Sequence, residues 1–181
     1  MESLAQLFSY VCGQVHLCVV NGEALPLCDR CVGLYFGGAY AILLSLLRPR
    51  ATAPMLWLHG LFMLAMIPFG FHFIQHGALV RIITGQLFAY GLIYYLLLVP
   101  AEDRSVRTGH RATLEYFGAA LAGIVLLLIL VVRGGHLIAM LLTVTAALGL
   151  ATYALLAVVN LATMVSIATQ SFLHHDRSKS S

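Results

Sequence analysis

Residues 115–132 read EYFGAALAGIVLLLILVV, an almost entirely apolar run. Glu115, at its first position, is its only charged residue. A helix that crosses a bilayer needs about 20 mostly apolar residues. Inside lipid, backbone polar groups must be hydrogen-bonded within their own segment, which a helix achieves. The stretch therefore predicts a transmembrane helix.

Four other apolar runs have a similar length and character. Prolines, glycines and charged residues interrupt the chain between the runs, as at Arg48-Pro49-Arg50 and Arg133-Gly134-Gly135-His136. Because these breaks are clear, we predict an all-α integral membrane bundle of about five transmembrane helices. The predicted spans are residues 31–47, 54–71, 82–99, 115–132 and 137–159.

The composition of the whole chain agrees with a membrane protein. Of its 181 residues, 61% are hydrophobic and 9% are charged, whereas soluble domains carry roughly 25% charged residues. The net charge of +3 lies in loops and a tail, so it indicates orientation in a membrane and no nucleic-acid partner. We predict a single membrane domain over residues 1–181, with a Cys/His segment at 1–30, a helical bundle at 31–172 and a cytoplasmic polar tail at 173–181.

The distribution of lysine and arginine predicts the orientation. With five spans, seven of these residues fall on one side of the membrane and three, Arg30, Arg81 and Arg133, fall on the other. Cytoplasmic loops carry the excess of positive charge. The N-terminus is therefore expected outside the cell membrane and the C-terminus in the cytoplasm.

A short amphipathic helix is predicted before the first span. Its apolar residues recur at helical spacing, at Leu4, Leu7, Phe8, Val11 and Val15. On such a helix, Cys12 and His16 are four residues apart and lie on one face.

The segment at 12–37, CGQVHLCVVNGEALPLCDRCVGLYFG, contains all four cysteines of the chain. Cys28 and Cys31 have the short spacing that lets two thiolates bind one ion. The turn signal Asn21-Gly22 lies between this pair and the earlier Cys12 and His16. If the chain reverses direction at this turn, the two pairs of residues come together. We therefore predict a divalent metal site, such as a zinc site, with ligands Cys12, His16, Cys28 and Cys31, and with Cys18 as a spare ligand.

Two other interpretations of the cysteines stay open. On an oxidising exterior, four cysteines can form disulfides in three pairings, or Cys28 and Cys31 can act as a redox pair. Cysteine is also a small apolar side chain that fills space in a protein core.

A second polar segment is expected on the same membrane face. His72 and His76 are four residues apart, and together with Gln75 they are candidates for a second half of the site. The alternative is a pair of solvated histidines between two spans. Arg30 and Arg81 are candidates for binding an anion, because a guanidinium group holds phosphate through two hydrogen bonds. Arginine side chains also simply extend to lipid head groups.

The sequence assigns no catalytic residue. It contains no His-Glu-x-x-His, Gly-x-Ser-x-Gly or P-loop motif, and acidic residues are almost absent from the predicted spans. Whether the chain is an enzyme stays open at this point. The candidates are a metal-assisted hydrolase or transferase for an anionic, lipid-like substrate, an anion or small-solute transporter, and a non-catalytic membrane protein whose cysteines form structural disulfides.

Two blocks of sequence resemble a known family. The first is Cys12-x-Gln14 with Gly22-x-x-Leu25-Pro26-Leu27-Cys28-x-Arg30-x-x-Gly33-x-Tyr35-x-Gly37, and the second is Gln75 with Arg81-x-x-Thr84-Gly85. With them, roughly the first half of the chain resembles the domain of unknown function 2085 family of prokaryotic membrane proteins. The resemblance implies a small multi-pass protein of the prokaryotic plasma membrane, with no established activity.

Overall fold

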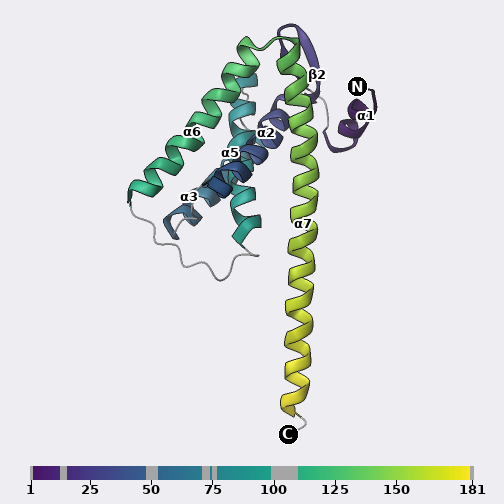
Figure 1. Cartoon of the computed structure of the whole chain (residues 1–181), viewed down its shortest axis with the longest axis vertical. Helices are drawn as coiled ribbons and strands as arrows, with labels where there is room; N and C mark the ends of the chain where they lie inside the picture. Colours follow the sequence, from purple (N-terminus) through teal and green to yellow (C-terminus); the bar gives the residue numbers. More distant parts are fainter. Residues whose placement is uncertain are drawn as a thin grey trace.

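The computed structural model describes residues 2–12, 16–47, 53–70, 74, 77–98 and 110–179. This part of the chain is mostly helical, as predicted, and its helices form one bundle with a short hairpin at one end (Figure 1). In chain order the elements are α1 (Glu2–Val11), β1 (Leu17–Val20), β2 (Glu23–Cys28), α2 (Asp29–Leu47), α3 (Ala53–Leu64), α4 (Met66–Gly70), α5 (Ala78–Leu98), α6 (His110–Arg133) and α7 (His136–Lys179).

The hairpin of β1 and β2 is a feature that the all-α prediction missed. The two strands are antiparallel, and Val20 pairs with Glu23 across the turn. Asn21 and Gly22 form this turn with φ angles of 51° and 82°. Positive φ at both central residues is the geometry that favours Asn-Gly in two-residue hairpins. The predicted turn is therefore confirmed, but it joins two strands.

Close contact between α2 and α5 forms the centre of the bundle. A Cβ atom added to Gly33 of α2 would overlap the carbonyl oxygen of Ile82 in α5. A Cβ atom added to Gly85 of α5 would overlap the carbonyl oxygen of Arg30 in α2. Because both positions lack a side chain, the two backbones touch where the helices begin.

Buried polar side chains hydrogen-bond between the helices. Gln86 Nε2 donates to the Tyr90 hydroxyl at 2.8 Å, and that hydroxyl donates to the carbonyl oxygen of Ala120 at 3.0 Å. The fully buried ring of His59 in α3 lies with Nε2 2.9 Å from the Tyr116 hydroxyl in α6. Such bonds replace those that water would make in a soluble protein.

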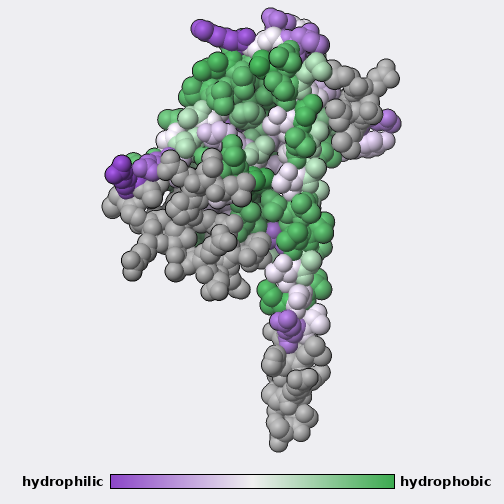
Figure 2. Space-filling view, in the orientation of Figure 1, coloured by the Kyte–Doolittle hydropathy of each residue, from purple (hydrophilic) through white to green (hydrophobic). Residues whose placement is uncertain are grey.

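The outer surface of the bundle is apolar. Leucine, valine and isoleucine side chains of α6 and α7 are largely exposed, and apolar residues cover much of the face shown in Figure 2. Within the described residues, three helical segments are long and apolar enough to cross a membrane: Ala78–Leu97, Thr113–Arg133 and His136–Gln170.

The predicted span at 54–71 is divided into two helices. α3 ends at Leu64 and α4 begins at Met66, and the apolar helical stretch Leu56–Phe69 is shorter than a full span. The predicted break after α6 is confirmed, since Gly134 and Gly135 separate α6 from α7. α7 then continues without interruption to Lys179, well past the predicted end of the fifth span.

Candidate metal centre

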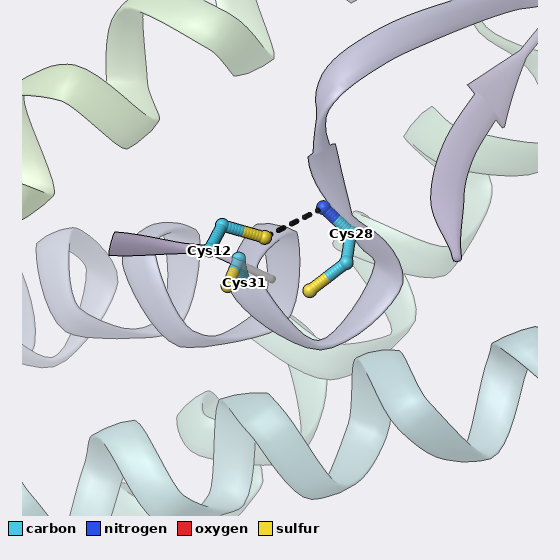
Figure 3. A group of neighbouring side chains, drawn as sticks. All are labelled: Cys12, Cys28 and Cys31. Carbon is cyan, nitrogen blue, oxygen red and sulfur yellow. Dashed lines mark hydrogen bonds between the residues drawn. The ribbon is translucent and has the colours of Figure 1, made fainter. Parts of the chain in front are cut away.

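Three cysteines from three segments meet beside the hairpin. Cys12 follows α1, Cys28 is the last residue of β2, and Cys31 lies in the first turn of α2. Their sulfur atoms all lie within 4.8 Å of one another, and Figure 3 shows the three side chains gathered there. The hairpin makes this possible because it returns the chain toward the end of α1.

Backbone groups hold Cys12 in this cluster. Its N–H donates to the carbonyl oxygen of Phe8 at 2.8 Å, so the last turn of α1 fixes the position of the residue. Its Sγ accepts a hydrogen bond from the N–H of Cys28 at 3.3 Å (Figure 3). These two contacts fix the position of the Cys12 side chain.

The thiol of Cys28 has a pKa below the ordinary value for cysteine. A hydrogen bond from the Cys31 thiol lowers the pKa of Cys28, and burial only partly opposes this effect. A thiolate is the form that binds a metal ion or attacks an electrophile.

His16 lies outside the group of three sulfur atoms. α1 ends at Val11, so Cys12 and His16 do not share a helical face, and that basis for the predicted pair is wrong. The His16 side chain is exposed, while its carbonyl oxygen accepts a hydrogen bond from the N–H of Asp29 at 3.1 Å. This bond places the His16 backbone next to the turn that carries Cys28 and Cys31.

Cys18, the predicted spare ligand, has different surroundings. Its side chain is buried in β1, and its thiol hydrogen-bonds to Asp29. Burial raises the pKa of Cys18 to about 12, and the nearby charge of Asp29 acts in the same direction. Cys18 therefore stays protonated at neutral pH.

The two arginines predicted to bind an anion already have protein partners. Arg30 Nη2 donates to the carbonyl oxygen of Phe69 at 2.8 Å. Arg81 Nη1 lies 3.6 Å from Asp29 Oδ2, an ion pair that the sequence reasoning missed. Burial raises the pKa of Asp29, and the charge of Arg81 works against that rise. In each arginine the buried Nε has no hydrogen-bond partner among the described residues.

His72, Gln75 and His76, the predicted second half of the site, lie outside the described residues. Of the two predicted halves, the structure therefore describes the one built from the hairpin and the start of α2. Arg81, at the start of α5, joins it through Asp29.

A comparison with known families covers the segment that contains most of this centre. Residues 13–95 match DUF2085, a family described as predicted membrane protein. The resemblance seen in the sequence is thereby confirmed over these residues. No curated protein and no solved structure matches the chain. The DUF2085 description gives no activity, so the chemistry must be argued from the site.

The two DUF2085 sequence blocks lie against each other in the fold. Arg30 and Gly33 belong to the first block, and Arg81 and Gly85 belong to the second. Gly85 meets the carbonyl oxygen of Arg30, and Gly33 meets that of Ile82, next to Arg81. The blocks thus form one structural unit, which supports the turn that carries Cys28 and Cys31.

The three thiols suit a soft or borderline metal ion. Thiolate ligands select zinc, copper(I) and iron–sulfur centres over hard cations such as magnesium. With Zn–S bonds of about 2.3 Å, sulfur atoms of a tetrahedral site lie roughly 3.8 Å apart. The three sulfur atoms, which lie within 4.8 Å of one another, need only a small shift to reach this spacing. Three cysteines leave one position of the tetrahedron for another ligand.

Proposed function

We propose that the chain is a multi-pass membrane protein that binds zinc through Cys12, Cys28 and Cys31. The observation that carries the proposal is the convergence of three sulfur atoms to within 4.8 Å of one another. The hydrogen bond from Cys28 N–H to Cys12 Sγ supports it, because it holds the Cys12 sulfur beside Cys28.

His16 is the proposed fourth ligand. Its carbonyl oxygen is bonded to Asp29 N–H, so its backbone is held near Cys28, and its imidazole is exposed. Three thiolates and a neutral imidazole are a common zinc ligand set. With Zn²⁺ they carry a net charge of −1.

The proposed topology has five spans. α2, α3 with α4, α5, α6 and α7 follow the five predicted apolar runs in order. The excess of positive charge in the loops on the other side supports an orientation in which the hairpin and the cysteines lie outside a prokaryotic plasma membrane and the C-terminus lies in the cytoplasm.

An anionic lipid-like head group is the proposed molecule at this face. The support is the position of Arg30 and Arg81, two guanidinium-bearing residues at the starts of α2 and α5 on the predicted outer face. A guanidinium group can donate two hydrogen bonds to phosphate while part of it stays bonded to protein.

The metal is tested by elemental analysis of the full chain, purified in detergent under reducing conditions. We expect close to one zinc per chain, and a loss of most of it in Cys12→Ser, Cys28→Ser and Cys31→Ser. His16→Ala should weaken binding and keep some metal. Cys18→Ser is the matched control, because serine retains a donor toward Asp29 and Cys18 lies outside the cluster.

Two results would overturn the proposal. One is fully reduced wild-type protein that contains no metal and takes up none when zinc is added. The other is intact-mass measurement without reductant that finds disulfides among Cys12, Cys28 and Cys31 in freshly isolated protein. The second result would establish the disulfide alternative.

A further inference from the structure

The ion pair between Asp29 and Arg81 involves the turn that carries two of the three clustered cysteines. Asp29 follows Cys28 in the chain and precedes Cys31 by two positions, so it sits within the turn that carries both ligands. Its side chain is only 7% exposed, and that of Arg81 is 19% exposed. A carboxylate buried this deeply needs a partner, and Arg81 supplies the opposite charge.

Arg81 is itself fixed to the bundle. It lies in the first turn of α5, where its carbonyl oxygen accepts a hydrogen bond from Thr84 Oγ1 at 3.1 Å. The next residue, Ile82, contacts Gly33 of α2 through its carbonyl oxygen. The guanidinium group therefore extends from a part of α5 that cannot shift without disturbing α2.

The third cysteine reaches the cluster by a separate route. Cys12 is held by the last turn of α1 and by the N–H of Cys28, and no described contact joins it to Arg81. The distances from Cys12 to the other two sulfur atoms thus depend on where the turn between Cys28 and Cys31 is held. Asp29 is the one carboxylate in that turn.

We propose that Arg81 is a positioning residue for the cysteine centre: through Asp29 it holds the turn from Cys28 to Cys31 at the place where its two sulfur atoms meet that of Cys12. In this proposal Arg81 is not a ligand and acts through the Asp29 carboxylate. The role rests on the proposed function in one respect, since it takes zinc as the ion that the three cysteines bind.

The experiment compares Arg81→Gln, Asp29→Asn and their double variant with the wild type. Zinc affinity is measured by competition with a chromophoric chelator, and folding by thermal unfolding in detergent. Loss of a group that orients metal ligands typically weakens binding 10- to 100-fold. We expect each single variant to fall in that range and the double variant to match the singles, because both changes remove the same contact. Arg81→Lys keeps the charge and should restore part of the affinity.

A second measurement tests, in metal-free protein, how close the cysteine sulfur atoms lie to one another. Phenylarsine oxide bridges two neighbouring thiols with loss of water, so intact-mass analysis of metal-free, reduced protein reports how close the cysteines are. We expect one adduct per wild-type chain and slower capture in Arg81→Gln. Arg133→Gln is the matched control, because it removes an exposed arginine on the same predicted face, and it should leave both measurements unchanged.

The outcomes separate the two proposals. Wild-type protein that binds no zinc but captures the arsenical in an Arg81-dependent way overturns the zinc function and supports the positioning role. Folded Arg81→Gln or Asp29→Asn protein with wild-type zinc affinity and wild-type capture overturns the positioning role alone. Equal losses in Arg133→Gln and Arg81→Gln would also overturn it.

Discussion

His136 Nδ1 lies 2.8 Å from Glu23 Oε2 and 2.9 Å from Glu23 Oε1. Glu23 opens β2 directly after the hairpin turn, and His136 is the first residue of α7. This contact ties the hairpin to the start of α7, which is 113 residues later in the chain, at the end of the bundle where α6 meets α7 (Figure 1). The hairpin that carries Cys28 is thus joined to α7 by a polar contact as well as by its apolar face.

Removing this contact should have a small effect. Both side chains are substantially exposed, at 66% and 49%, and exposed ion pairs contribute about 0–1 kcal/mol. We expect Glu23→Gln to lower the free energy of unfolding in detergent by no more than about 1 kcal/mol. A loss above about 2 kcal/mol would show that the hairpin depends on this contact far more than its exposure indicates.

A methyl group at Gly33 should be poorly tolerated. Its Cβ would overlap the carbonyl oxygen of Ile82, which is backbone and cannot rotate away. We expect Gly33→Ala to cost about 1–3 kcal/mol of stability, as overpacking usually does. Gly118→Ala is the control, since a Cβ there meets nothing within 4 Å. In the exposed middle of α6, alanine should keep or raise the unfolding temperature. Similar losses in both variants would contradict the α2–α5 contact.

The thiols should react in a fixed order. The lowered pKa of Cys28 makes its thiolate available at lower pH, while the pKa of Cys18, raised to about 12, keeps that thiol protonated at neutral pH. We expect iodoacetamide at pH 7 to label Cys28 of reduced, metal-free protein well before Cys18. Peptide mass spectrometry over time follows the order. Labelling of Cys18 at the rate of Cys28 in folded protein would contradict it.

The bond between His59 and Tyr116 should stabilise the packing of α3. Tyr116→Phe removes the hydroxyl that lies 2.9 Å from Nε2 of the fully buried His59 ring. We expect a loss of about 0.5–2 kcal/mol in thermal unfolding, the range for a hydrogen bond between buried side chains in a helical membrane protein. Tyr10→Phe, at a side chain that is 80% exposed, serves as the control and should change little.

Helices were the part of this fold that could be predicted, because long apolar runs leave a membrane chain few alternatives. The turn at Asn21 could also be predicted, since Asn-Gly favours positive φ. The strands beside it could not. Leu17–Val20 is only four residues long, and so short an apolar run is equally compatible with an extension of the preceding helix.

The cysteine site shows a similar division. Spacing predicted that Cys28 and Cys31 act together, and the turn predicted the approach of Cys12. The choice of His16 rested on a helix that in fact ends at Val11. The pairing of Asp29 with Arg81 could not be predicted, because it depends on how α5 packs against α2. A local sequence pattern does not reveal this packing. The sequence offered one indication of this ion pair, which is the position of the acidic Asp29 between Cys28 and Cys31.

The length of α7 has a consequence for the other side of the molecule. Asn160 Nδ2 donates to the carbonyl oxygen of Leu96, near the end of α5, so the two helices are level at that point. α7 continues from there to Lys179, a rise of roughly 29 Å at 1.5 Å per residue, and Figure 1 shows this part extending beyond the rest of the bundle. Because this part of α7 projects beyond the bundle, a small tilt of the helix at Asn160 would displace Lys179 much more than the residues beside α5.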